Sequence, residues 1–302
     1  MKRILKSSSF VFVFAAALAL AYPGLAGLLE PCLIPAIIVL MTFSLIEIEL
    51  RKLDVRRDLK SILTALGLNY IFLSGLILVG AVFLLKDVSL WRGFIVMIAT
   101  PPAVGIIALS TLLKGDTKFA LVANTSIYVL SILLMPAILL LFLGSAINPL
   151  TILKILLELI GLPLVLSRVI GLIPRYEQLK EDKDILINLG FFVVIYVIIG
   201  LNHDVLLSEY GLLIPVSIIG IIRTFFAGTL VFGLGRALNI PLDRNIAYAL
   251  FGSYKNLGLT ATIALLLFGA RATIPSAVCI LFEVLMFPYL SMLTKHQRLT
   301  LS

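Results

Sequence analysis

The sequence predicts an all-α membrane protein of about ten transmembrane helices, arranged as two inverted five-helix repeats with a broken fourth and ninth helix. The first observation is composition: 61% of the 302 residues are hydrophobic and 13% are charged, against about 45–50% and about 25% in soluble domains. The second is length, because spans of ~20 apolar residues leave room for about ten crossings and little else. The third is a pair of helix-breaking motifs, each midway along an apolar run.

Apolar runs separated by charged loops define the individual spans. Basic residues gather at one set of span ends, which includes both termini, and the opposite set holds Lys86, Arg92 and Arg271. The positive-inside rule therefore places both termini in the cytoplasm and predicts an even number of spans across the cell (inner) membrane. The net charge of +8 is explained by this orientation in the lipid bilayer, so no nucleic-acid partner is expected. The expected spans are residues 10–29, 33–50, 61–85, 91–113, 118–143, 149–167, 185–201, 211–235, 243–269 and 274–294.

The first apolar run has two interpretations. Lys2 and Arg3 followed by residues 10–21 would also suit a secretory signal peptide. The run continues past Pro23 to Leu29, which is span length, so a first membrane span is the preferred interpretation.

The two halves of the sequence resemble each other. In the first half, residues 112–115 precede a Met-Pro pair ending at Pro136, and in the second, residues 267–269 precede a Phe-Pro pair ending at Pro288. Five spans in each half would turn the second half upside down relative to the first, as in many secondary transporters. Chance similarity between apolar stretches is the alternative. The predicted repeats are residues 1–148 and 149–302.

Two spans carry a break near mid-membrane. The fourth span meets Thr100, Pro101 and Pro102 about nine residues from its start, where proline removes backbone donors. The ninth span meets residues 252–256 (Gly-Ser-Tyr-Lys-Asn) at a similar depth from the opposite face. Opened backbone at that depth must line a cavity or be buried in protein, so a binding site is expected there. A proline kink that only aids packing is the alternative for the fourth span.

Three ionisable residues fall near span centres: Lys255, Glu283 and Arg223. Each is costly in hydrocarbon and needs a partner or a function. Lys255 and Glu283 lie about half-way along consecutive spans, which favours an ion pair between them. Such a pair either holds the helices together or lets Lys255 gain and lose a proton during transport. Arg223 would alternatively snorkel to the membrane surface.

Other polar residues within the spans are candidates for the cavity wall or for hydrogen bonds between helices. They are Asn69 and Tyr70 in the third span, and Asn124, Thr125 and Ser126 in the fifth. Cys32 and Cys279 lie far apart in apolar sequence and suggest neither a disulfide nor a metal site. No cofactor and no metal is expected.

With these motifs the chain resembles the bile acid:sodium symporter family. The first half shares a proline-bearing break, Gly115-Asp116 and a polar stretch at residues 124–126, and the second half shares residues 256–261 (Asn-Leu-Gly-Leu-Thr-Ala) and Pro275. The resemblance covers nearly the whole chain in outline and implies two inverted repeats whose broken fourth and ninth helices cross. The auxin efflux carriers share much of this outline.

The chain departs from this family at the residues that bind sodium. After the break, where the family has a Ser-Asn pair, stand Ile106 and Ile107, and Phe251 and Lys255 replace a Glu and a Gln ligand. A hard cation needs oxygen ligands, which isoleucine and phenylalanine side chains lack. Both sodium sites are therefore expected to be lost, although Thr125 retains an oxygen.

These observations predict a secondary transporter of a small organic anion, working by alternating access without sodium and with protons as the candidate coupling ion. The alternatives are a sodium-coupled organic-anion symporter, an auxin-efflux-type carrier and, less favoured, a channel. No catalytic or metal-binding motif points to an enzyme. The expected substrate-binding residues are Thr100, Pro101, Asn69, Asn124, Thr125, Ser126, Ser253 and Asn256. The expected coupling residues are Lys255, Glu283 and Arg223.

Overall fold

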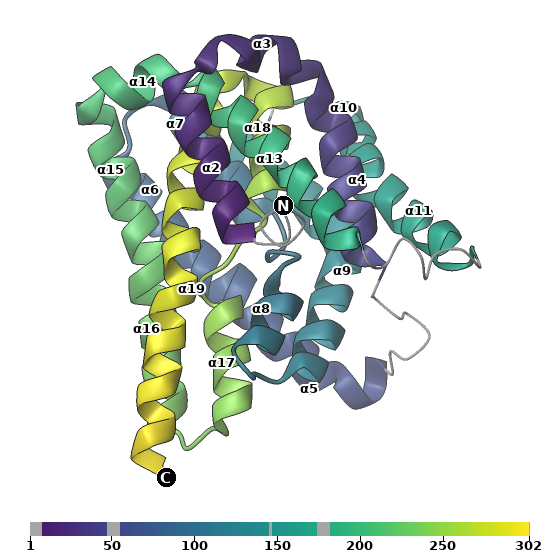
Figure 1. The fold of residues 1–302 in the computed structure, drawn as a ribbon, viewed down its shortest axis with the longest axis vertical. Helices are drawn as coiled ribbons and strands as arrows, with labels where there is room; N and C mark the ends of the chain where they lie inside the picture. The colour runs from purple at the N-terminus through teal and green to yellow at the C-terminus, as the bar shows by residue number, and fades with distance from the viewer. Residues whose placement is uncertain (1–7, 47–54, 145–146, 174–181, 302) are drawn as a thin grey trace.

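A computed structural model describes residues 8–46, 55–144, 147–173 and 182–301 (Figure 1). Every element in these ranges is helical, with short 3-10 turns and π-helical segments between α-helices. In chain order the elements are α2 (Ser8–Ala21), η1 (Pro23–Leu25), α3 (Ala26–Leu29), η2 (Glu30–Cys32), α4 (Leu33–Leu45), α5 (Val55–Leu66), η4 (Gly67–Leu73), α6 (Ser74–Leu84), α7 (Val88–Ala99), α8 (Ile106–Leu112), α9 (Thr117–Leu143), α10 (Pro149–Leu156), η6 (Leu157–Gly161), α11 (Leu162–Gly171), α13 (Lys183–Leu201), α14 (His203–Ser208), α15 (Tyr210–Ile221), η7 (Ile222–Phe226), α16 (Ala227–Ala237), α17 (Leu242–Phe251), α18 (Leu257–Phe268), η8 (Ala270–Thr273) and α19 (Ile274–Leu301).

Seven of the described helices are long and apolar enough to cross a membrane, so the chain is a multi-pass membrane protein. Three further apolar helices are shorter, and two of them, α7 and α18, are segments of interrupted helices. The third is α2, at the start of the described chain. The seven candidate spans are Pro23–Leu45, Asp58–Leu84, Thr117–Leu143, Pro149–Gly171, Lys183–Leu201, Tyr210–Ala237 and Ala270–Arg298.

The helices pack as two groups. In the first, called here the α13 group, α13 packs against α2, α3 and α4, and η6 and α11 pack against α4, with α10 next to η6. In the second, the α7 group, α7 packs against α6, α9, α18 and α19, and α5, α8 and α15–α17 surround this centre. Each group draws helices from both halves of the sequence. Figure 1 shows α2, α4 and α13 side by side at one side of the α7 group.

Acidic caps and ion pairs hold the ends of two central helices. Asp87 caps the first turn of α7, and its carboxylate lies 3.1 Å from Arg271, which also pairs with Glu209 at 3.0 Å. Asp116 caps α9 and pairs with Arg244 of α17 at 2.8 Å. Partial burial alone would raise the pKa of Asp87, but first-turn amides and the Arg271 guanidinium outweigh it and hold this pKa below its ordinary value. These pairs connect the start of α7 to η8 and the start of α9 to the start of α17.

Gly93 allows the closest backbone approach between α7 and η8. A Cβ at this position would overlap the carbonyl oxygen of Ala272 and lie 3.0 Å from Pro275. Gly93→Ala is therefore expected to destabilise the protein by about 1–3 kcal/mol, the usual cost of overpacking. Thermal unfolding in detergent measures the loss.

Gly75→Ala is the matched control, because a Cβ at Gly75 would meet no atom within 4 Å. Alanine also favours helix formation over glycine, so this variant should be at least as stable as the wild type. Equal unfolding temperatures for Gly93→Ala and Gly75→Ala would contradict the close contact at η8.

Candidate functional site

Two interrupted helices meet at the centre of the α7 group. Residues 100–105 separate α7 from α8, and residues 252–256 separate α17 from α18. The backbone amide of Asn256 donates to the carbonyl of Pro101 at 3.0 Å, and the hydroxyls of Thr100 and Thr260 lie 2.8 Å apart. The two predicted breaks therefore form one continuous site in which each opened backbone supplies hydrogen bonds to the other.

The side chain of Lys255 crosses from the second break to the end of α7. Its Nζ donates to the carbonyls of Thr100 at 2.9 Å and Ile98 at 3.2 Å, and lies 4.5 Å from the centre of the Tyr70 ring. The residue is fully buried. The carboxyl end of a helix and an aromatic face both attract a cation, so this position suits an ammonium group.

Glu283 pairs with Arg223, and not with Lys255 as the sequence favoured. Its Oε1 lies 2.6 Å from Arg223 Nη2 and also accepts the backbone amide of Lys255 at 3.0 Å. Arg223 further donates to the carbonyl of Ser253 at 3.0 Å. Arg223 is fully buried, so the alternative that it snorkels to the membrane surface is wrong. The lysine cannot reach the carboxylate with Nζ because its side chain extends towards α7.

Asn69 and Arg223 both lie in π-helical segments and both bind the second break. Asn69, in η4, donates through Nδ2 to the carbonyls of Phe251 at 2.9 Å and Tyr254 at 3.0 Å. Arg223, in η7, binds Ser253 as described. A π-helical turn changes the direction of the side chains around it. The two segments thus direct donors from the third and eighth predicted spans to carbonyls that the broken helix leaves unpaired.

The three polar residues of the fifth predicted span, Asn124, Thr125 and Ser126, differ in their hydrogen-bond partners. Asn124 donates to the Ala103 carbonyl at 3.3 Å and so contacts the first break. Thr125 and Ser126 bond to carbonyls one turn earlier in α9. Ser253, in the second break, donates in the same way to the Ala249 carbonyl of α17. Among these residues, only Asn124 has a described side-chain hydrogen bond to a break.

Tyr128 is a residue of the site that the sequence interpretation missed. Its hydroxyl donates to the Pro102 carbonyl at 2.9 Å and accepts from Asn256 Nδ2 at 2.8 Å, so it bridges the two breaks. Tyr254 and Thr260 were missed as well. Helical spacing contained the signal, because Tyr128 follows Asn124 by four residues and Thr260 follows Asn256 by four.

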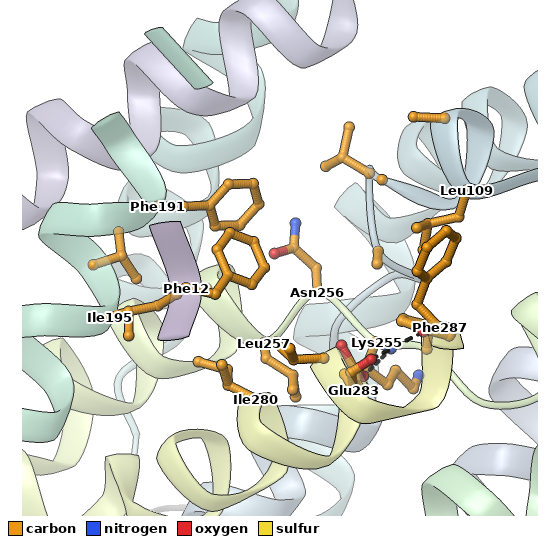
Figure 2. Close-up of a pocket in the computed structure, with 18 of the residues that line it drawn as sticks. Phe12, Leu109, Phe191, Ile195, Lys255, Asn256, Leu257, Ile280, Glu283 and Phe287 are labelled. Atoms are coloured by element: carbon orange, nitrogen blue, oxygen red, sulfur yellow. Dashed lines mark hydrogen bonds between the residues drawn. The ribbon is translucent and has the colours of Figure 1, made fainter. Parts of the chain in front are cut away.

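A cavity of about 400 Å³ opens beside the breaks (Figure 2). Of the predicted site residues, Lys255, Asn256 and Glu283 line it, whereas the other substrate and coupling candidates lie behind its wall. Figure 2 shows the amide of Asn256 directed into the space between Phe191 and Leu109. Its main lining residues are Phe12, Val104, Gly105, Ala108, Leu109, Leu112, Phe191, Val194, Ile195, Leu257, Gly258, Ile280, Val284 and Phe287.

Paired helix breaks beside a cavity, within a multi-pass bundle, are typical of the class of membrane transporters. The sequence profile of the SBF-like CPA transporter family (DUF4137) matches residues 9–298, and the chain belongs to this family. It is a transporter family, not an enzyme family, and it is related to the sodium bile acid symporter family that the sequence resembles. No curated protein matches the chain.

Proposed function

We propose that the protein is a sodium-independent secondary transporter of a small organic anion, working by alternating access. The observation that carries this proposal is the Lys255 ammonium, hydrogen-bonded to the end of α7 between the two breaks. A fixed cation at that position supplies the positive charge that a bound ion would otherwise bring to the carbonyl end of a broken helix.

Ten spans in two inverted repeats, residues 1–148 and 149–302, are part of this proposal. Seven long helices, α2 and the two interrupted helices together make ten crossings. The third and eighth spans each contain a π-helical segment, and the fifth and tenth each contain a proline, Pro136 and Pro288. These matching features support the repeat and make chance similarity less favoured.

A crossing of the fourth and ninth spans is supported by contacts on both sides of the breaks. Segment α7 packs against α18, and α8 packs against α17. The ion pairs at the two ends correspond as well: Asp87 at the start of the fourth span pairs with Arg271 after the ninth, and Arg244 near the start of the ninth pairs with Asp116 after the fourth. In both pairs the carboxylate comes from the first repeat and the guanidinium from the second.

Sodium independence is supported by the side chains around Lys255. Phe251 is fully buried and packs its ring edge-on against Phe119, while Ile106 is buried within the same apolar cluster. These side chains offer no oxygen to a hard cation. Thr125, which could offer one, donates its hydroxyl to the Leu121 carbonyl. The sodium-coupled alternative therefore finds little support around the breaks.

An anionic substrate is favoured by the charge of the site. Arg223, Lys255 and Glu283 sum to one positive charge, which an organic anion in the cavity would balance. The cavity wall is mainly apolar, so the anion should carry an apolar body. Benzoate, a compact monoanion with an aromatic ring, is a suitable first probe.

The cavity would open to the cytoplasm in the proposed topology. It is lined by α8, whose end leads to Lys114 on the basic side of the protein. On the other side of the breaks, Asn202, between α13 and α14, donates to Thr273 of η8 at 2.7 Å, and both residues are buried. Both termini would then be cytoplasmic in the inner membrane, and rocking of the α13 group against the α7 group would expose the site alternately.

Uptake into proteoliposomes tests the proposal. Radiolabelled benzoate and other organic anions that raise the unfolding temperature of the purified protein are offered with a sodium gradient or with choline in its place. We expect saturable uptake at equal rates in both conditions. Strict sodium dependence would reject the sodium-independent mechanism, and conductance without saturation would indicate a channel.

A further inference from the structure

Glu283 is the one of the three buried charges whose side chain reaches the cavity surface. Its side chain is 12% exposed, whereas Arg223 and Lys255 are fully buried. Oε1 is occupied by Arg223 and by the amide of Lys255. Oε2 has no hydrogen-bond partner among the described residues, and Glu283 lines the cavity (Figure 2). We propose that Glu283 is the proton-binding site of the transporter and takes its proton at Oε2 from the cavity.

The groups around Glu283 favour this carboxylate as the group that changes charge. Arg223 faces it from η7, and the backbone amide of Lys255 faces it from the second break. The hydroxyl of Tyr254 donates to the backbone carbonyl of Glu283 and not to its carboxylate. Cys279 lies one turn earlier on α19 and next to Arg223. A guanidinium stays charged and a tyrosine stays neutral at physiological pH. In the described part of the chain, no second carboxylate forms a hydrogen bond or ion pair with these groups.

Lys255 is less suited to take up the proton from this side. Its Nζ is bonded to two carbonyls at the end of α7 and points away from the cavity. A proton that leaves it would have to pass through packed protein, whereas Oε2 of Glu283 is reached directly by cavity water. The sequence offered proton exchange by Lys255 as one of two interpretations, and our proposal places the proton on Glu283 instead.

Protonation of Glu283 would couple proton and anion binding. With Glu283 ionised, the three groups carry one positive charge, and with Glu283 protonated they carry two. An anion in the cavity is attracted more strongly in the second state, and by linkage the bound anion raises the proton affinity equally. The pair of ligands would cross the membrane together as a proton symport. The coupling of proton and anion transport rests on the proposed function, whereas the protonation of Glu283 does not.

Labelling with dicyclohexylcarbodiimide tests the protonation without any substrate. This apolar carbodiimide adds to a protonated carboxylic acid, and the adduct that rearranges to an N-acylurea keeps all atoms of both molecules. We expect mass spectrometry of the full-length protein in detergent to find the adduct on Glu283, increasing several-fold from alkaline to mildly acid buffer. Labelling of Glu283 that is absent, or equal at every pH, would overturn the proposal.

Transport by Glu283→Gln tests the coupling. Glutamine keeps an oxygen for Arg223 and for the Lys255 amide but cannot exchange a proton. We expect the variant to lose benzoate accumulation driven by a pH gradient and to exchange benzoate at a rate that no longer depends on pH. Glu158→Gln is the matched control, because Glu158 is exposed on η6 outside the cavity, and it should behave as the wild type.

The two failures are distinguishable. If wild-type vesicles carry benzoate and Glu283→Gln still accumulates it with the pH gradient, the coupling by Glu283 is wrong and the transport function stands. If wild-type vesicles carry no organic anion, the proposed function and the coupling are both wrong, and the labelling alone decides whether Glu283 binds the proton.

Discussion

Replacement of Lys255 by methionine is expected to abolish transport and to lower the unfolding temperature. Methionine fills a similar volume but leaves the Thr100 carbonyl without its donor at a buried helix end, and leaves the Ile98 carbonyl with the Ser74 hydroxyl alone. Each unsatisfied buried group costs about 1–3 kcal/mol. The relief of a desolvated charge opposes this cost, but the ammonium is well satisfied here by two carbonyls and the Tyr70 ring. We therefore expect a net destabilisation of about 2 kcal/mol.

The decrease in transport rate should be larger than the decrease in the amount of folded protein can explain. Without the ammonium, the second break no longer donates a side-chain hydrogen bond to the end of α7. The site also loses one positive charge that would attract an anionic substrate. A weakening of only about 1.4 kcal/mol already reduces transport tenfold. Uptake of benzoate by the folded variant, measured at equal protein content, gives the effect.

Lys154→Met is the control for this substitution. Lys154 lies exposed in α10, so its replacement removes the same charge from the chain without touching the breaks. It should leave uptake and stability unchanged. Wild-type uptake by Lys255→Met, with its pH dependence intact, would exclude both a built-in cation and a proton-exchanging role for Lys255.

The sequence predicted the positions of the breaks because their causes are local. Pro101 and Pro102 lack the amide hydrogens that a helix needs, and residues 252–256 combine a glycine with polar side chains in an apolar run. The buried charges were also identifiable, since any ionisable residue at a span centre requires a partner. Composition was sufficient for an all-helical membrane protein.

The choice of partners could not be predicted in the same way. Similar positions along consecutive spans favoured Lys255 as the partner of Glu283. In the structure, Arg223 in the π-helical segment η7 binds the carboxylate, and Lys255 binds the end of α7. A helical pattern of 3.6 residues per turn does not reveal where a π-helical turn is inserted. Thr125 and Ser126 donate their hydroxyls to carbonyls within α9, which the sequence does not reveal, and their role in substrate binding stays a prediction.

Replacement of Arg223 by glutamine is expected to be the most destabilising of these changes. Arg223 is fully buried, and its removal leaves the Glu283 carboxylate without the cation 2.6 Å away and the Ser253 carbonyl without a donor. Removal of one partner of a buried ion pair costs about 3–5 kcal/mol. Thermal unfolding in detergent, followed by the fluorescence of Trp91, measures the change. Arg236→Gln, an exposed position in α16, is the control and should be neutral.

A double-mutant cycle separates the ion pair from the other contacts of Arg223. If the pair dominates, Arg223→Gln combined with Glu283→Gln should be less destabilised than the sum of the single variants, by about 1–3 kcal/mol. In the double variant two amides replace two charges, so neither is left as an uncompensated ion in the bundle. Strict additivity would show instead that Arg223 acts through the Ser253 carbonyl of the second break. Arg223 would then stabilise the broken helix independently of Glu283, and protonation of the carboxylate would leave the fold of the break unchanged.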